Sequence, residues 1–497
     1  RRQSVSLLLC LCNLSVHTAM PATRRSPARE RPSPSPQRRR SGVAKSAAAA
    51  PKQAAPSKLS LVDHVLLPLL LMVTTPTFCH ITAWLTAQPE PTLSTLAAAA
   101  AAGPAALAAD VLASTMPDAK AAVLLTAFSG LALLIYAIPG PVKFGPISDR
   151  GARPAYADNA MWHCVLFPLV FVLGAAAGLY PLSVLYDHFG ATVGLLNFGG
   201  LAFCALLYAK GLSRLGLRPS GPDAGSSGKG LLFDYYWGTE LYPQLGGVDV
   251  KRFVNCRISM TYWMLAGVSF AAASHSRHGR LDPGLVLCAA SQFVYLVKFF
   301  YWEIGYMRSI DIITDRAGFY ETWGCLVWVP SIYTLHTRSM VQLPSGLSWP
   351  AAGAIFAVGL LGVAFNFEAD LQRQRFRETG GAALVWGRKP IAIEAEYHVT
   401  DPKSGKLARH TSLLLVSGWW GVARHAQYLF ELTAAWSWGL LAGVGTHGAL
   451  PLFYAAFLTV LLVHRAIRDE EKCSLKYGAA YAKYKAMVPY KIVPYVF

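Results

Sequence analysis

Long apolar blocks separated by short polar stretches dominate the pattern of this 497-residue chain. A helix that crosses the hydrocarbon core of a bilayer needs about 20 mostly apolar residues. The blocks of that length are 60–84, 120–139, 160–181, 190–211, 257–275, 283–301, 321–338 and 349–368. The block 430–464 is long enough for two helices joined near residues 443–448. The alanine-rich stretch 91–113 is a further possible span. Because open sheet edges cannot be satisfied in lipid, the pattern predicts an all-α polytopic membrane bundle of about nine to ten transmembrane helices.

Composition and charge agree with a membrane protein and argue against a nucleic-acid partner. Hydrophobic residues make up 54% of the chain and charged residues only 14%, against about 25% charged in soluble domains. Of the net charge of +18, residues 1–58 supply +11. The excess that remains suits loops on the cytoplasmic side of a membrane. Rich in Arg, Ser and Pro, the segment 1–58 is predicted to be disordered, either as a cytoplasmic tail or as an organelle transit peptide.

Several familiar cofactor motifs are missing from the sequence. The nine cysteines show no paired spacing and the histidines form no ligand constellation, so no metal is predicted. Neither a Rossmann glycine fingerprint after a strand nor a phosphate-binding loop is present. Any nucleotide site must therefore be built by membrane helices and the loops beside them.

One cluster of acids lies between two apolar blocks. Glu303, Asp311 and Asp315 are surrounded by aromatic residues that include Tyr306. Charged groups at membrane depth cost several kcal/mol unless they are paired or wetted, and on a helix Asp311 and Asp315 would share a face. The aromatic density favours a lined cavity with functional acids. An interfacial loop with an ordinary Asp315–Arg316 salt link is the alternative.

Two basic and aromatic clusters follow in the C-terminal third. Arg373 and Arg377 fall on one helical face and would suit phosphate groups, although basic residues there would equally anchor a helix end on the cytoplasmic side. A second cluster, in 417–428 and 468–484, combines Arg, Trp and Tyr with acids. Such side chains suit stacking, phosphate contacts and a ribose hydroxyl.

At these motifs the sequence resembles the sterol reductase family of the endoplasmic reticulum, which includes the sterol C-14 and C-24(28) reductases and the lamin B receptor. The resemblance covers about residues 145–497, and its specific runs are 237–243, 311–333, 384–390 and 468–497. Runs 315–320 and 323–334 are most similar to the plant-type 7-dehydrocholesterol reductases within that family.

The resemblance implies that NADPH reduces the C7–C8 double bond of 5,7-diene sterols. It divides the chain into a bundle with a sterol cavity at 59–369 and an NADPH-binding part with the last transmembrane helices and a polar tail at 370–497. The cofactor-binding residues that it implies are Arg373, Arg377, Leu415, Trp420, Gln427, Tyr428, Asp469, Cys473, Lys476, Tyr477 and Tyr484. It also implies a multi-pass protein of the endoplasmic reticulum membrane, with sterol and membrane lipid as partners.

The chemistry of the reaction supplies the catalytic candidates. An isolated ring olefin is a poor hydride acceptor, so an acid must protonate it first, and burial in an apolar cavity keeps a carboxyl group protonated near neutral pH. We expect Glu303, Asp311 or Asp315 to be this acid, with Tyr306 and Tyr333 as proton relays.

Three other functions are weighed against this one. A sibling reductase acting on the C-14 double bond is the nearest alternative. The C-terminal fifth, around Arg424, His425 and Tyr428, also resembles isoprenylcysteine carboxyl methyltransferases, which bind S-adenosylmethionine. A scaffold role like that of the lamin B receptor would need a folded N-terminal reader domain, for which 1–58 is too short.

Overall fold

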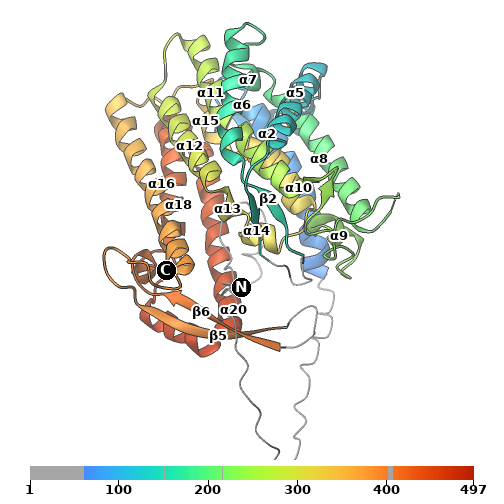
Figure 1. Cartoon of the computed structure of the whole chain (residues 1–497). Helices are drawn as coiled ribbons and strands as arrows, with labels where there is room; N and C mark the ends of the chain where they lie inside the picture. Colours follow the sequence, from blue (N-terminus) through green and yellow to red (C-terminus); the bar gives the residue numbers. More distant parts are fainter. Residues whose placement is uncertain (1–60, 147, 149–151, 215, 401–406) are drawn as a thin grey trace, which may run out of the picture.

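Long helices run side by side through most of the molecule and meet a polar end that carries a β-hairpin (Figure 1). The structure is a computed structural model that describes residues 61–146, 148, 152–214, 216–400 and 407–497. The segment 1–58, expected to be disordered, lies outside these described residues. A mostly helical membrane bundle is what the sequence predicted.

The helices that correspond to the apolar blocks are η1 (Val62–Leu66) continued by α2 (Leu67–Leu85), α5 (Ala119–Tyr136), α6 (Ala160–Ala176), α8 (Phe189–Gly211), α11 (Met260–His278), α12 (Pro283–Tyr301), the π-helix η3 (Phe319–Tyr333), α16 (Trp349–Glu378), α18 (Ala426–Leu441) and α20 (Phe453–Met487). Within the described ranges, six helical segments are long and apolar enough to cross a membrane: Val62–Leu85, Ala119–Tyr136, Phe189–Gly211, Pro283–Tyr301, Trp349–Glu378 and Leu450–Met487. This count does not confirm nine to ten spans.

Shorter elements connect the long helices. The short helices are α3 (Leu93–Ala102), α4 (Pro104–Ser114), α7 (Val184–Asp187), α9 (Leu231–Trp237), α10 (Val250–Arg252), η2 (Phe253–Ser259), α13 (Glu303–Tyr306), α14 (Ile310–Ile313), α15 (Leu335–Ser339), α17 (Trp419–Val422), α19 (Val444–His447) and η4 (Leu450–Leu452). In the part of the chain that the structure describes, the strands form three antiparallel pairs: β1 (Val142–Phe144) with β2 (Ala155–Ala157), β3 (Gln244–Leu245) with β4 (Val248–Asp249), and β5 (Ala392–Thr400) with β6 (Leu407–Leu415).

Two parts of the predicted pattern differ in the structure. The stretch 91–113 forms two short helices rather than one span, because Gly103 and Pro104 interrupt it and Pro104 begins the second helix. The apolar block 430–464 ends at residue 464, whereas helix α20 continues into the polar tail as far as Met487. A kink at Gly478, whose φ of +50° suits glycine, bends this helix near its end.

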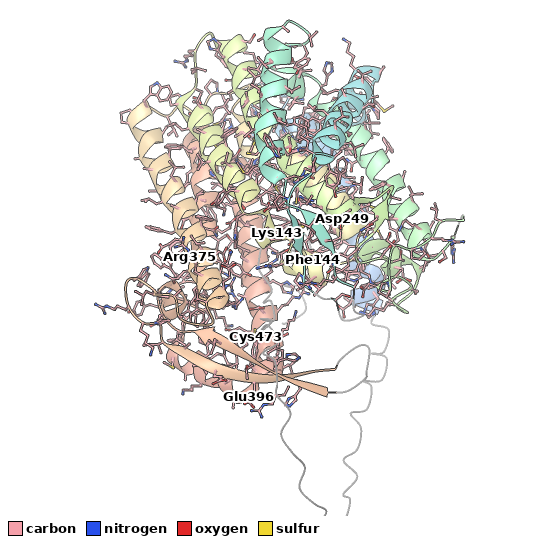
Figure 2. The ribbon with its side chains drawn as sticks, in the orientation of Figure 1. Lys143, Phe144, Asp249, Arg375, Glu396 and Cys473 are labelled. Atoms are coloured by element: carbon pink, nitrogen blue, oxygen red, sulfur yellow. The ribbon has the colours of Figure 1, made fainter. Side chains whose placement is uncertain are left out.

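The polar end is assembled around three of the long helices. α16 packs against α18 and α12, and α18 packs against α20. The β5–β6 hairpin, with Ala392 opposite Leu415, packs on α20. Figure 2 shows Cys473 of α20 and Glu396 of β5 below the bundle, with Arg375 of α16 above them.

Candidate active site

The connection between α12 and η3 carries Asp311 and Asp315, and we name residues 310–316 the acid loop. Both carboxyl side chains are buried, at 1% and 0% relative exposure. Lys251 of α10 holds the backbone of the acid loop, because its ammonium donates to the carbonyl oxygens of Asp311 at 2.7 Å, Ile312 at 3.0 Å and Asp315 at 2.6 Å. The three donors of a lysine ammonium are thus all used on one short segment.

The two acids of this loop differ in their surroundings. Asp311 Oδ1 accepts a charge-assisted hydrogen bond from Arg465 Nη2 at 2.5 Å, which favours the carboxylate form. Burial raises the pKa of Asp315, while Arg468 and Lys251 oppose the rise, and Thr314 Oγ1 donates to Asp315 Oδ1 at 3.1 Å. Burial raises the pKa of Asp311 as well, to about 8, although Arg465 opposes the rise. Both carboxyl groups are therefore suited to hold a proton near neutral pH, and the direct contact of Asp311 with Arg465 is the reason to prefer Asp315 as the donor.

Glu303 occupies a different buried network. Its carboxylate accepts from Arg252 Nη2 at 2.7 Å and from both terminal nitrogens of Arg257. Asn159 Oδ1 accepts from the same two guanidinium groups. Burial alone would raise the pKa of Glu303, but Arg257 and Arg252 outweigh burial and hold it at about 2. A carboxylate held ionised in this way is a poor proton donor near neutral pH.

We expect Glu303→Gln to act on stability rather than on the proton transfer. The substitution leaves two buried guanidinium groups without their counter-charge, which costs about 3–5 kcal/mol. Because the pKa of Glu303 is depressed by folding, its contribution is present above about pH 4.5 and is lost as pH falls towards about 2. Thermal unfolding measured from pH 4 to 8 should show a lower midpoint for the variant throughout. Turnover per folded molecule is expected to keep the wild-type pH profile. A changed profile would contradict this prediction and would make Glu303 a candidate proton donor again.

The two candidate relay tyrosines lie apart from each other. Tyr306 is buried in α13 beside Phe299, at a ring distance of 5.5 Å, and its hydroxyl has no hydrogen-bond partner among the described residues. Tyr333 ends η3, at the opposite end of this helix from the acid loop. Its ring packs at 5.1 Å from Trp263 and 4.6 Å from Tyr454. Of the two, Tyr306 is the nearer to the acid loop along the chain.

Sequence reasoning missed three charged residues at this site. Lys251 and Arg465 contact the acid loop directly. Glu321, in the first turn of η3, is buried and accepts from Thr322 Oγ1 at 3.1 Å. The sequence signal for Glu321 was a lone acid inside an apolar block, and for Arg465 a cation at the end of one. Lys251 carried no such signal because it lies in a polar loop.

The residues expected to bind the cofactor come together at the polar end, on α16, β6, α17, α18 and α20. Arg373 of α16 lies over the indole of Trp420 at 3.8 Å, and Trp420 Nε1 donates to the carbonyl of Ala369 at 2.8 Å. The hydroxyl of Tyr484 donates to the carbonyl of Trp420 at 3.1 Å. Leu415, the last residue of β6, is buried in the same cluster as Trp420. Arg373, Trp420 and Tyr484 thus form one continuous wall.

A second group of these residues lies along α20 and the start of α18. Cys473 Sγ donates to Asp469 Oδ2 at 3.8 Å, one turn away on α20. His425 Nε2 lies 4.0 Å from Asp469 Oδ2 and stacks on Tyr428 at 5.0 Å. Next to Tyr428, Gln427 accepts through its backbone carbonyl from Asn366 at 3.0 Å. These contacts join α18 to α20.

The remaining cations complete the cluster. Lys476 Nζ lies over the rings of Tyr397 at 4.1 Å and Tyr477 at 5.1 Å. Arg377 interacts electrostatically with Tyr477, Cys473 and Asp469. The eleven residues that the sequence implied as cofactor-binding are together named the cofactor cluster: Arg373, Arg377, Leu415, Trp420, Gln427, Tyr428, Asp469, Cys473, Lys476, Tyr477 and Tyr484. It offers three cations, several aromatic faces and one carboxylate.

Polar atoms in this cluster and in His425 beside it fit a dinucleotide. Among the described residues, Arg377 Nε, Gln427 Oε1 and His425 Nε2 are buried with no hydrogen-bond partner. Buried polar atoms are normally satisfied, so a polar ligand is the expected partner. Guanidinium groups suit phosphates, aromatic faces suit a base, and Asp469 suits a ribose hydroxyl. Within the same described ranges, no group of three or more His, Cys, Asp or Glu could hold a metal ion.

One helix links the two parts of the site. Arg465, the partner of Asp311, lies one turn before Asp469 on α20. The acid loop and the cofactor cluster are therefore fixed to the same helix. This arrangement suits a reaction in which a proton and a hydride reach neighbouring atoms of one substrate.

Comparison with known protein families decides which class of membrane enzyme carries this arrangement. The model of the ergosterol biosynthesis ERG4/ERG24 family matches residues 75–497. The chain belongs to this family. The sterol reductase family predicted from the sequence is thus confirmed, and with it an oxidoreductase of sterol double bonds. The ERG4/ERG24 family implies a reduced nicotinamide cofactor. Its match also includes the C-terminal tail on which the methyltransferase alternative rested.

Three relatives illustrate the range of the ERG4/ERG24 family. The 7-dehydrocholesterol reductase of Arabidopsis thaliana is 41% identical over 74% of this chain and 82% of its own. The 7-dehydrocholesterol reductase of Danio rerio is 34% identical over 72% of this chain and 74% of its own. The Delta(14)-sterol reductase of Methylotuvimicrobium alcaliphilum is 35% identical over 74% of this chain and 81% of its own.

Proposed function

We propose that this protein uses NADPH to reduce the C7–C8 double bond of 5,7-diene sterols in the endoplasmic reticulum membrane. The observation that carries the proposal is the identity of 41% to a plant 7-dehydrocholesterol reductase over 368 residues. The Delta(14)-sterol reductase relative is 35% identical over 372 residues. A sterol with a C-14 double bond is therefore the second candidate substrate.

The proposed reaction begins with protonation of the sterol olefin. Protonation creates a cationic ring carbon, and hydride addition to that carbon completes the reduction. When bound, NADPH supplies the hydride. Asp315 holds the proton to be transferred, since burial raises its pKa, and positioned acids of this kind contribute about 10²–10⁴-fold to rate. Asp311 is bound directly by Arg465 and orients the acid loop.

The cofactor cluster binds and orients the dinucleotide in this proposal. Arg373, Arg377 and Lys476 contact its phosphates, and the rings of Trp420 and Tyr484 bound the site. Asp469 accepts from a ribose hydroxyl. Leu415, Gln427, Tyr428, Cys473 and Tyr477 line the remaining walls. The support is the shared location of these groups and the three buried polar atoms, on Arg377, Gln427 and His425, that lack a hydrogen-bond partner among the described residues.

We expect Arg377→Gln to raise the KM for NADPH about tenfold with little change in kcat. The lost guanidinium contributes a charge-assisted contact to a phosphate, and such contacts are worth about 1.5–3 kcal/mol. Steady-state kinetics with NADPH and NADH would show whether the loss is specific to the extra phosphate of NADPH. Arg375→Gln is the matched control, because Arg375 lies on the same helix but is exposed (Figure 2). An equal KM for both variants would contradict the assignment of Arg377.

Expression of the chain in an ergosterol-producing yeast tests the proposed function. Gas chromatography–mass spectrometry should show 5,7-diene sterols converted to 5-ene sterols with a saturated C7–C8 bond. An unchanged sterol profile from membrane-inserted protein would contradict the proposal. Complementation of a yeast strain that lacks sterol C-14 reduction would then support the second candidate substrate.

We further propose that α6, α11, η3 and α18 cross the membrane beside the six candidate segments, which gives ten spans among the described residues. Each of the four corresponds to an apolar block of the sequence and packs among the longer helices. Glycosylation tags placed in the loops on either side of each helix test this topology.

A further inference from the structure

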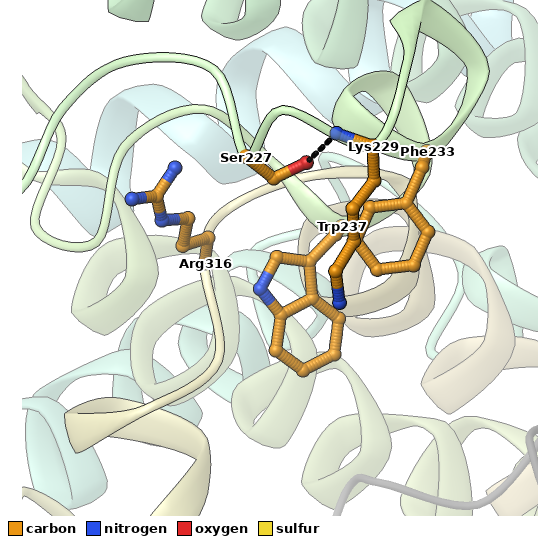
Figure 3. A pocket seen from close by; sticks show the side chains of 5 residues that line it. All are labelled: Ser227, Lys229, Phe233, Trp237 and Arg316. Atoms are coloured by element: carbon orange, nitrogen blue, oxygen red, sulfur yellow. Dashed lines mark hydrogen bonds between the residues drawn. The ribbon is translucent and has the colours of Figure 1, made fainter. Parts of the chain in front are cut away.

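A pocket of about 330 Å³ opens beside α9, outside the acid loop and the cofactor cluster. Ser227, Lys229, Phe233, Trp237 and Arg316 line it. In Figure 3, Arg316 and the ammonium of Lys229 lie on either side of the Trp237 indole. The pocket is therefore lined by two cations and an aromatic wall, with no carboxylate among its lining residues.

Neighbouring groups hold these side chains in place. Arg316 Nη1 donates to the carbonyl of Gly225 at 2.6 Å, and Lys229 Nζ lies 4.7 Å from the centre of the Phe233 ring. Trp237 stacks between Phe233 at 6.3 Å and Tyr320 at 5.7 Å. Both cations thus keep a fixed position on a rigid aromatic surface, which lowers the entropy cost of binding an anion.

Asp234, on the same helix as Phe233 and Trp237, is turned to other partners. Asp234 accepts from Ser226 Oγ at 2.5 Å and from the backbone N–H of Ser227 at 2.8 Å. Its charge is directed at the loop before α9 rather than at Lys229 or Arg316. The lining therefore favours a negatively charged ligand.

The position of α9 indicates where such a ligand comes from. α9 packs against η1 and α2, and Phe233 contacts His64 edge-to-face at 5.0 Å. His64 lies in the first turns of the candidate span Val62–Leu85, so the pocket is at the level where lipid headgroups meet water. Leu66, Leu69 and Val73 of the same span are exposed and offer an apolar surface for acyl chains.

We propose that this pocket binds the phosphate of an anionic membrane lipid. Lys229 and Arg316 contact the phosphate oxygens, and the acyl chains follow the exposed face of α2. A guanidinium suits a phosphate bidentately and an ammonium adds a point charge. This site does not depend on the sterol reaction. Arg316 of the pocket directly follows Asp315 in the sequence, so a bound lipid would also fix the end of the acid loop.

Native mass spectrometry of the full chain in a neutral detergent tests this site. Phosphatidic acid and phosphatidylcholine with the same acyl chains are each titrated into the protein. We expect one saturable phosphatidic acid adduct, bound at least about tenfold more tightly than phosphatidylcholine, since two cations contribute about fivefold each near an anionic surface. Lys229→Gln should weaken phosphatidic acid binding about fivefold and leave phosphatidylcholine binding unchanged.

Lys143→Gln is the matched control, because Lys143 is an exposed lysine of β1 outside the pocket. It should keep wild-type binding. Equal binding of the two lipids, or an equal loss in both lysine variants, would overturn the proposal. Displacement of phosphatidic acid by millimolar inorganic phosphate would assign the pocket to a free ion instead of a lipid. A higher KM for NADPH in Lys229→Gln would assign it to the cofactor, and either result overturns the lipid site.

Discussion

Asp315→Asn is expected to lower turnover about a hundredfold or more while the protein still folds and inserts. The amide keeps the size of the side chain and its place in the acid loop but has no acidic proton to give to the sterol. Loss of one positioned general acid typically costs about 10²–10⁴-fold in rate. Sterol turnover by purified protein in detergent, normalised to folded protein, measures the effect.

The pH dependence of the wild-type enzyme gives a second readout of the same residue. The donor must carry its proton, so kcat should be highest below the pKa of Asp315 and fall as pH rises through it. Burial moves this pKa upward, so the fall comes at higher pH than for an exposed aspartate. In Asp315→Asn the remaining activity should lose this limb of the profile. Wild-type turnover in the variant would contradict the role of Asp315 as the proton donor.

Arg465→Gln is expected to cost about 3–5 kcal/mol of stability. The substitution removes the partner of Asp311 at 2.5 Å and leaves a buried carboxylate without its counter-charge. The double variant Asp311→Asn with Arg465→Gln should recover most of the loss, because no buried charge is then left alone. Thermal unfolding of all three variants in one detergent gives the coupling energy of the pair.

An exposed ion pair is the control for this experiment. Arg409 and Glu396 pair on the β5–β6 hairpin, with side chains 65% and 50% exposed. Arg409→Gln should change stability by no more than about 1 kcal/mol. If Arg465→Gln has an equally small effect, or if the double variant is no more stable than the single one, the ion pair does not hold the acid loop on α20.

Apolar block length located most helices of the bundle because it reports directly on burial in lipid. It failed where backbone chemistry decides instead. At 91–113 the alanine content suggested one span, but Gly103 and Pro104 divide the helix. Block length also does not report where a helix ends beyond the lipid: after residue 464 the chain is polar, but Lys, Glu and Ala are good helix formers, and α20 continues to a kink at Gly478 and on to Met487.

The site could be predicted only as far as local patterns and the family resemblance reach. The acids of the loop were visible as charges between apolar blocks. Their partners were not, because Lys251 lies 60 residues and Arg465 154 residues from Asp311 along the chain, and no local pattern encodes such contacts. The same limit applies to Glu303, whose two arginine partners lie 46 and 51 residues before it. Its neutralisation by Arg252 and Arg257 appears only in three dimensions.

The length of one short stretch of α20 sets the spacing between the two halves of the site. Arg465 and Asp469 are four residues apart, or about 6 Å at the rise of an α-helix. Inserting a single residue between them would rotate the later part of α20 by about 100° relative to the earlier part. Arg465 could then not face Asp311 while Asp469 and the residues after it face the rest of the cofactor cluster. Substitutions at exposed Ile467 should be tolerated, whereas insertions and deletions at 466–468 should abolish activity whatever residue is used.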